Sequence, residues 1–192
     1  KNKKYQIKIY KKIPLEAGLG GGSMNAASIL DYFIKKKKIR INRKNLRKLI
    51  MKIGSDVIIG MHNSPIIIKG SKIINLKKKV KLYIVLFKPS FGCTTKKIYN
   101  NVKIYNNSSI KKLKNNYTDF NFLTNLNNDL EKVAFTIYPK LNNYKKYILK
   151  LPMVLFARMT GSGSSLIGYF NSKKASINAA KILKKKFKNN LC

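Results

Sequence analysis

Acidic residues are the scarcest charged group in this sequence of 192 residues. Six Asp and Glu stand against 42 Lys and Arg, which gives a formal net charge of +36. Such an excess, taken alone, predicts a nucleic-acid or anionic-surface partner. Arginine, however, normally leads base and phosphate recognition, and the sequence holds only Arg40, Arg43, Arg47 and Arg158. The lysines are scattered beside abundant Ile and Asn, as in proteins of A+T-rich genomes, so we expect no specific nucleic-acid partner.

Cysteine and long apolar runs are also scarce. Cys93 and Cys192 have no metal-ligand spacing and are too few for a disulfide framework, so we expect free thiols in a reducing compartment. Apolar runs such as residues 66–68 and 152–157 fall far short of the ~20 residues that cross a bilayer. No signal peptide pattern starts the sequence. We therefore expect a protein of the cytoplasm or an organelle stroma, without a membrane partner.

What is present is enough for a packed core, since 44% of the residues are hydrophobic. The hydrophobic periodicity predicts strands over residues 5–10, 66–69, 73–76, 82–87, 154–159 and 165–170. It predicts helices over residues 23–38, 42–52, 95–101, 129–138, 141–149 and 175–187. The continuous apolar run 82–87 is typical of a strand buried on both faces. Residues 103–121 predict a loop or a poorly ordered helix, and the absence of a repeated βαβ pattern predicts an α+β fold.

Four glycines, at positions 18, 20, 21 and 22, stand directly before a predicted helix. Backbone N–H groups and the positive end of a helix converge at such a place, which favours a bound phosphate. Glycine suits this loop because a Cβ would block phosphate oxygens and because such loops use positive φ angles. A flexible glycine turn is the alternative, although the embedded Leu19 favours a fixed shape. The loop is not a Walker A motif, since no Gly-Lys-Ser/Thr follows.

The glycine loop, within residues 13–27, resembles the ATP-binding motif of the GHMP kinase superfamily. Four later segments match that superfamily in order: Gly-Ser-Asp-Val at 54–57, Lys-Pro…Thr…Tyr at 88–99, Asn-Asp-Leu-Glu…Pro at 128–139, and the late glycine motif at 158–164. Together the five segments are distributed along most of the sequence, from residue 13 to residue 164. The Gly-Gly-Gly form of the loop resembles in particular the members that phosphorylate 4-diphosphocytidyl-2-C-methyl-D-erythritol.

The resemblance implies a kinase that uses ATP and Mg²⁺ to phosphorylate the 2-hydroxyl of this cytidine diphosphate-linked polyol, a step of the non-mevalonate route to isoprenoid precursors. It implies that Asp56 is the catalytic carboxylate, although an aspartate after a Gly-Ser turn can also simply cap a helix. The residues that would hold the ATP phosphates are Pro14, Ala17, Gly18, Leu19, Gly20, Gly21, Gly22 and Ser23. The Ser23 hydroxyl would also bind Mg²⁺, and helix capping is its alternative role.

The resemblance also implies a substrate side to the site. Thr95, Tyr99, Gly161, Ser162 and Gly163 match positions that face the substrate in the superfamily. The ring of Tyr99 can stack on a base, and packing in the core is the alternative. A tight β-turn is the alternative role for Gly161 and Gly163.

The architecture that the resemblance implies is a two-domain α+β fold with the active site between the domains. Residues 1–77 would complete an N-terminal ATP-binding domain, and residues 78–192 would form a ferredoxin-like C-terminal domain. The superfamily's first segment carries a lysine that pairs with the catalytic aspartate, and nothing here corresponds to it. We therefore expect an incomplete N-terminal domain, with the first segment either supplied separately or lost by truncation.

Three alternatives to this function stay open. The first is another GHMP kinase, of the homoserine or mevalonate type. The second is a basic nucleic-acid-binding protein, and the third is an inactive remnant that binds ATP weakly or not at all. The sequence also departs from the superfamily's pattern at Met24, where the superfamily has a second small hydroxyl residue, and at residues 58–60, which replace its Pro-Phe-Phe.

Overall fold

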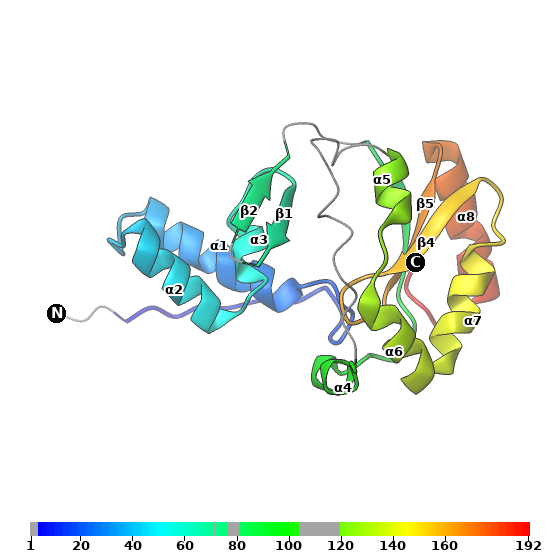
Figure 1. The fold of residues 1–192 in the computed structure, drawn as a ribbon, viewed down its shortest axis with the longest axis horizontal. Coiled ribbons are helices and arrows are strands. Elements are labelled where there is room, and N and C mark those ends of the chain that lie inside the picture. Colours follow the sequence, from blue (N-terminus) through cyan, green and yellow to red (C-terminus); the bar gives the residue numbers. More distant parts are fainter. Residues whose placement is uncertain (1–3, 71, 77–80, 104–119) are drawn as a thin grey trace.

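The computed structural model describes residues 4–70, 72–76, 81–103 and 120–192. It divides into an N-terminal half of helices with a small hairpin and a C-terminal half built on an antiparallel sheet (Figure 1). This layering confirms the predicted α+β class. The predicted domain boundary between residues 77 and 78, and most of the segment 103–121, lie outside the described residues. None of the described helices is long and apolar enough to span a membrane.

The N-terminal half is held by a small core between its helices, which are α1 Gly21–Lys35, α2 Arg43–Ile53 and α3 Val57–Gly60. Its buried residues are Ala27, Leu30, Ile50 and Val57. Helix α2 starts where predicted because Asn42 caps it, its side-chain oxygen accepting the N–H of Asn45 at 2.8 Å. The first two helices were predicted, whereas the four-residue α3 was not.

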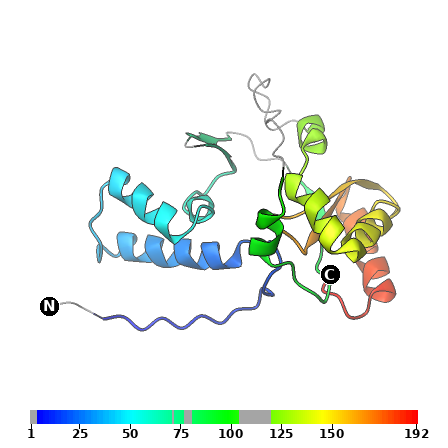
Figure 2. The ribbon, with the colours of Figure 1, turned by 60° about the horizontal axis from the view of Figure 1, so that its bottom comes forward.

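The predicted hairpin is present, with β1 Ile66–Lys69 pairing antiparallel with β2 Lys72–Asn75. The strand predicted over residues 5–10 is wrong. That segment is extended and runs alongside α1 (Figure 2), where the ring of Tyr5 contacts the ring of Phe33 at 4.8 Å. Alternation favours an extended backbone, but a strand also needs a hydrogen-bonded neighbour, and no described strand pairs with this segment.

The C-terminal half is a three-stranded antiparallel sheet of β3 Tyr83–Phe87, β5 Leu166–Phe170 and β4 Val154–Met159, in that order. Its helices are α4 Thr95–Asn100, α5 Phe120–Asn125, α6 Asp129–Ile137, α7 Pro139–Ile148 and α8 Lys173–Lys186. The larger core of the molecule lies between the sheet and its helices, and it includes Phe87, Ile148, Leu166 and Leu183. Except for α5, all of these elements were predicted.

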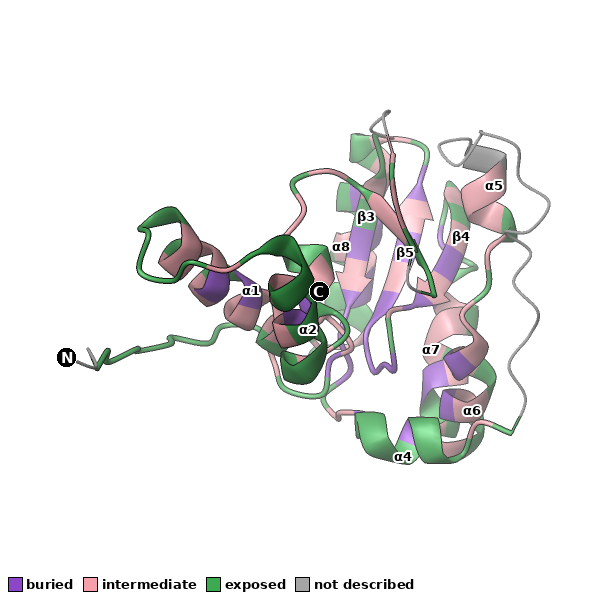
Figure 3. Ribbon diagram, turned by 60° about the vertical axis from the view of Figure 1, so that its left-hand side comes forward, coloured by how far each residue is buried: buried purple, intermediate pink, exposed green. Residues whose placement is uncertain are grey.

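The prediction that the strand at 82–87 is buried on both faces is wrong. Val85 and Phe87 are buried, but Ile84, next to Val85 on the same strand, is 47% exposed. The reason is the layering, because β3 is an edge strand and α8 packs on one of its faces (Figure 3). An apolar residue on the other face of β3 therefore contributes less to the core than the continuous apolar run predicts.

Candidate active site

The glycine loop ends in the N-terminus of α1. The helix begins at Gly21, two residues before the predicted start, and its N-cap Gly20 has a φ of 64°. A left-handed residue at this point is easily accommodated only by glycine. The first turn of α1 contains no acidic residue, so the positive end of the helix is not neutralised from within. The loop therefore has the backbone shape and the electrostatic sign that a phosphate requires.

The glycines of this loop do two different jobs. A Cβ on Gly18, whose φ is 67°, would overlap the carbonyl oxygen of Thr160 and lie 2.8 Å from the backbone nitrogen of Gly163. A Cβ on Gly20 or Gly22 would meet no atom of the described residues within 4 Å. Gly18 is therefore required by packing against the C-terminal half. The bare surface at Gly20 and Gly22 faces open space, as expected where a ligand approaches the backbone.

The C-terminal half holds the glycine loop through hydrogen bonds to three successive carbonyl groups. The N–H groups of Cys93 and Ser164 each donate to the carbonyl of Glu16 at 3.1 Å. The N–H of Ser165 donates to the carbonyl of Ala17 at 3.1 Å. The hydroxyl of Thr160 donates to the carbonyl of Gly18 at 2.6 Å. Three of these four donors lie on the connection between β4 and β5, which reaches the loop between the two halves (Figure 1). The shape of the loop is therefore set partly by residues far away in the sequence.

A cavity of about 320 Å³ lies over this loop. Its predicted lining residues are Pro14, Ala17, Gly18, Leu19, Gly20, Gly21, Gly22, Ser23, Asp56, Thr95, Tyr99, Gly161 and Ser162. They come from the glycine loop, the turn before α3, helix α4 and the β4–β5 connection. Segments that the sequence separates by more than 100 residues thus meet at one place, and Gly163 is the predicted site residue that does not line it.

Asp56 and Ser23 both lie in this cavity without the capping roles that were their alternatives. Asp56 occupies the N-cap position of α3, but its side chain makes no cap hydrogen bond. Its exposed carboxylate accepts a long hydrogen bond, 3.4 Å, from the hydroxyl of Ser55. The N-cap of α1 is Gly20, so Ser23 lies inside the first turn. The side chains of Asp56 and Ser23 are therefore available to a ligand.

The part of the cavity that was predicted to face the substrate is formed by α4 and the β4–β5 connection. The hydroxyl oxygens of Thr95 and Ser162 are hydrogen-bonded at 2.9 Å and so join these two elements. Tyr99 is 50% exposed, which rules out the core packing that was its alternative. Gly163 lies behind the lining, where a Cβ would be 2.8 Å from the sulfur of Met159 and its φ is 84°. The position of Gly163 indicates that it shapes the turn.

The sequence did not single out Lys11, Ile13, Leu15 and Glu16, which also line the cavity. Glu16 carried a signal, because acidic residues are so rare in this chain. Its carboxylate accepts a hydrogen bond from the hydroxyl of Thr94 at 3.0 Å, so it joins the glycine loop to the start of α4. Lys11 had no such signal in the sequence, because lysine is abundant throughout the chain.

Two titratable groups near the loop are structural. The buried ammonium group of Lys88 donates to the carbonyls of Pro89 at 2.7 Å and Phe91 at 2.8 Å, and burial lowers the pKa of Lys88. Burial raises the pKa of the Cys93 thiol to about 11. A thiol with that pKa stays protonated at neutral pH and is a poor nucleophile. The described residues contain no group of three or more acidic, His or Cys side chains that could hold a metal ion.

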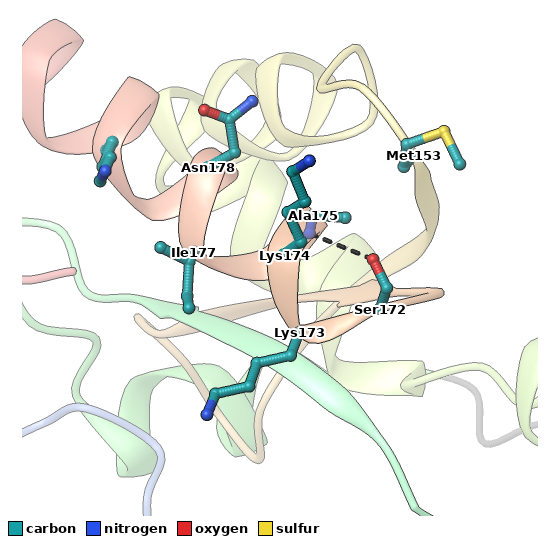
Figure 4. A pocket seen from close by; sticks show the side chains of 8 residues that line it. Met153, Ser172, Lys173, Lys174, Ala175, Ile177 and Asn178 are labelled. Carbon is teal, nitrogen blue, oxygen red and sulfur yellow. Dashed lines mark hydrogen bonds between the residues drawn. The ribbon is translucent and has the colours of Figure 1, made fainter.

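A larger hollow, of about 840 Å³, lies at the N-terminus of α8 (Figure 4). The hydroxyl of Ser172 accepts the N–H of Ala175 and is thus engaged in capping the helix. Lys173 and Lys174 point in opposite directions and do not converge on one point (Figure 4). None of the predicted site residues lines this hollow. The glycine-loop cavity is therefore the better candidate for the active site.

Comparison with known proteins gives matches along the chain. The family models "GHMP kinases N terminal domain" and "GHMP kinases C terminal" match residues 1–71 and 109–189. The 4-diphosphocytidyl-2-C-methyl-D-erythritol kinase of Pelagibacter ubique is 47% identical over 192 residues, which is all of this chain and 68% of that protein. The enzymes of the same name from Clostridium botulinum and Petrotoga mobilis are each 34% identical, over 86% and 84% of this chain, and the chain spans 62% and 65% of their lengths.

Two solved structures resemble the fold. A crystal structure of 4-(cytidine 5'-diphospho)-2C-methyl-D-erythritol kinase has a TM-score of 0.71 at 24% identity, over 91% of this chain and 65% of that one. A homoserine kinase from Cytophaga hutchinsonii has a TM-score of 0.70 at 17% identity, over 93% of this chain and 64% of that one. Because the two neighbours carry different substrate names at nearly equal scores, the fold alone does not choose a substrate.

Proposed function

We propose that this chain, which belongs to the 4-diphosphocytidyl-2-C-methyl-D-erythritol kinase family of GHMP kinases, takes part in ATP-dependent phosphorylation of the 2-hydroxyl of 4-diphosphocytidyl-2-C-methyl-D-erythritol. The observation that carries the proposal is the cavity where the glycine loop, Asp56 and residues of α4 and the β4–β5 connection meet. A phosphate loop and a free carboxylate at one cavity are what phosphoryl transfer to an alcohol requires.

The nucleotide side of the site consists of the glycine loop and the first turn of α1. Its backbone N–H groups would hold the ATP phosphates, and the bare surface at Gly20 and Gly22 leaves room for phosphate oxygens. The hydroxyl of Ser23 would bind Mg²⁺, which in such sites keeps several waters and is held largely by substrate phosphates. When bound, ATP and Mg²⁺ supply the γ-phosphoryl group and neutralise its charge.

Asp56 is the proposed catalytic residue. Its carboxylate lines the cavity and makes no cap hydrogen bond, so it can accept a hydrogen bond from the substrate hydroxyl. In that position it would orient the oxygen for in-line attack and accept its proton as the bond to the γ-phosphorus forms, the bond to the bridging oxygen breaks and ADP leaves. The neighbouring Ser55 hydroxyl, 3.4 Å away, is too far for a strong bond and leaves the carboxylate free to turn toward the substrate.

The cytidine-bearing substrate would bind along α4 and the β4–β5 connection. The half-exposed ring of Tyr99 offers a face for stacking on the base, and the linked hydroxyls of Thr95 and Ser162 offer polar contacts. Gly161 and Gly163 would let the connecting backbone lie close to the site. In this proposal the domains are residues 1–77 and 78–192, and the cavity lies where they meet.

We include a separately supplied segment among the partners. Tyr5, Ile7 and Ile9 are about half exposed on an extended backbone for which the described residues provide no neighbouring strand. An extended apolar segment of this kind can be paired by an added strand. The part of the Pelagibacter enzyme that this chain does not span is the natural source of such a segment to test.

The test of function is a phosphorylation assay with ATP, Mg²⁺ and the cytidyl substrate at physiological salt. It compares the chain, alone and with the remaining part of the Pelagibacter enzyme, with its Asp56→Asn variant. Asp31→Asn is the matched control, because it removes the same charge from a surface pair with Lys35 at 2.6 Å. We expect turnover to fall by about 10²-fold or more in the Asp56 variant and to persist in the control.

Two results would count against the proposal. Undiminished turnover by the Asp56→Asn variant would remove the catalytic assignment. Faster phosphorylation of homoserine or mevalonate than of the cytidyl substrate would keep the kinase but change its substrate.

A further inference from the structure

Asn128, at the start of α6, uses its side-chain amide in three hydrogen bonds. The amide nitrogen donates to the carbonyl of Met159 at 2.9 Å and to the carbonyl of Gly161 at 2.8 Å. The amide oxygen accepts the N–H of Leu130 at 3.0 Å and so caps the helix. Both donor hydrogens and the acceptor are engaged. This one side chain therefore ties α6 to the end of β4 and to the turn that follows.

Glu131, three residues farther along α6, completes the attachment. One of its carboxylate oxygens accepts the N–H of Met159 at 2.8 Å, and the other is 2.6 Å from the ammonium group of Lys145 on α7. The N–H and the carbonyl of Met159 are thus both bound by side chains of α6. Because β4 is an edge strand, these groups point away from β5 and would otherwise lack a neighbour.

The two residues that Asn128 binds, Met159 and Gly161, lie on either side of Thr160, which contacts the glycine loop. The N–H of Thr160 donates to the carbonyl of Ser165 at 2.9 Å. The hydroxyl of Thr160 then donates to the carbonyl of Gly18 at 2.6 Å. The start of α6 is therefore connected to the glycine loop by the hydrogen bonds of Asn128, the backbone of residues 159–161 and the hydrogen bond of Thr160.

We propose that Asn128, supported by Glu131, is a positioning residue that sets the shape of the glycine loop and thereby its affinity for ATP. The inference rests on the proposed function. Asn128 does not line the glycine-loop cavity, so its effect is exerted through Thr160 and Gly18. An amide is needed at this position because it alone combines two donors for the carbonyls with an acceptor for the helix cap.

The test variant is Asn128→Asp, which keeps the size and the helix cap but places a carboxylate against two carbonyl oxygens. Asn127→Asp is the matched control, since it adds the same charge at the exposed preceding residue. We expect ATP to bind about tenfold more weakly or worse to the Asn128 variant, and normally to the control. Lowering the pH should reduce the difference in ATP affinity between the Asn128→Asp variant and wild type, because a protonated Asp side chain regains one hydrogen-bond donor.

A second readout does not require ATP or turnover. The N–H groups of Ser164 and Ser165 donate to the glycine loop, so their hydrogen exchange should accelerate in the Asn128→Asp variant of the full chain without nucleotide. Unchanged exchange at these two amides, in a variant that folds, would overturn the proposal. Accelerated exchange together with absent ATP binding in wild type would instead indicate that the proposed function has failed.

Thr160→Val provides the second variant if Asn128→Asp does not fold. It removes the hydroxyl that donates to Gly18 and leaves the contacts of Asn128 intact. Weaker ATP binding with faster exchange at Ser164 and Ser165 would support the same connection from α6 to the glycine loop. Wild-type ATP affinity and exchange in this variant would refute it.

Discussion

The two roles assigned to the loop glycines predict that Gly18→Ala and Gly22→Ala have opposite effects on stability. At Gly18 the new Cβ would overlap the carbonyl oxygen of Thr160 and crowd the backbone nitrogen of Gly163 at 2.8 Å. Both are backbone atoms, so the β4–β5 connection itself must move. At Gly22 the same methyl group lies more than 4 Å from every atom that the structure describes, and the residue is in the first turn of α1.

The size of each effect follows from these surroundings. For Gly18→Ala, a left-handed conformation costs about 1–2 kcal/mol and the broken Thr160 bond about 1 kcal/mol more. A total of about 2–3 kcal/mol should lower the melting temperature of a chain of this size by about 4–12 °C. For Gly22→Ala, the higher helix propensity of alanine should stabilise by up to about 1 kcal/mol. The Cβ at Gly22 nevertheless projects into the space proposed for phosphate, so ATP binding should weaken.

The assay measures thermal unfolding by circular dichroism and ATP binding by calorimetry for the two variants and wild type. We expect Gly18→Ala to lose stability and ATP affinity together, and Gly22→Ala to lose ATP affinity alone. Unchanged ATP affinity in Gly22→Ala would mean that the open surface is not a phosphate cradle. Unchanged stability in Gly18→Ala would refute the packing argument for the glycine loop.

Four further predictions follow from single features. Ser165→Ala should raise stability by about 1 kcal/mol in urea unfolding, because its buried hydroxyl has no hydrogen-bond partner among the described residues. Asn42→Ala should lower it by about 1 kcal/mol through loss of the α2 cap. Cys93 should resist iodoacetamide in the folded chain at pH 8, since a pKa of about 11 keeps the thiol protonated. Mass spectrometry should find Cys93 alkylated only when the pH approaches 11 or when the chain is unfolded. Added NaCl should raise the melting temperature, because it screens repulsion within a chain of net charge +36.

Much of the fold could be predicted because its elements have local signals. Helix α2 has a cap residue at Asn42 and a regular apolar spacing, and α8 begins with the cap Ser172. The hairpin of β1 and β2 is marked by Gly70 between two apolar runs. These signals depend on neighbours in the sequence and not on the tertiary surroundings, so the boundaries agree closely with the structure.

What could not be predicted depends on partners distant in the sequence. The alternation of residues 5–10 is the same whether or not a neighbouring strand exists. The sequence therefore could not predict that no strand among the described residues pairs with this segment. The apolar run 82–87 is likewise compatible with one covered face or two, and the exposure of Ile84 depends on where the helices pack. Helix α3 has four residues, too few for a periodicity to be recognised.

For the candidate site too, local motifs could be predicted from the sequence, whereas contacts between distant residues could not. Ordered motifs predicted that the glycine loop, Asp56 and Tyr99 belong to one site, and the cavity brings them together. The motifs contain no information on what holds the loop in place. The bond from Thr160 to Gly18 joins residues 142 positions apart, and no local pattern indicates a contact of that span.

The rarity of acidic residues is a second signal beside the motifs, because it draws attention to individual carboxylates. In a chain where lysine is available everywhere, a carboxylate that persists should be making contacts that a lysine could not make. Glu16 and Glu131 fit this expectation, since each accepts hydrogen bonds that link separate segments around the glycine loop. Asp31 does not, because it pairs with Lys35 one helical turn away on the surface, where such a pair adds only about 0.3–0.5 kcal/mol. Scarcity therefore identifies candidates, and only the contacts that each carboxylate makes separate a positioning role from a solvated one.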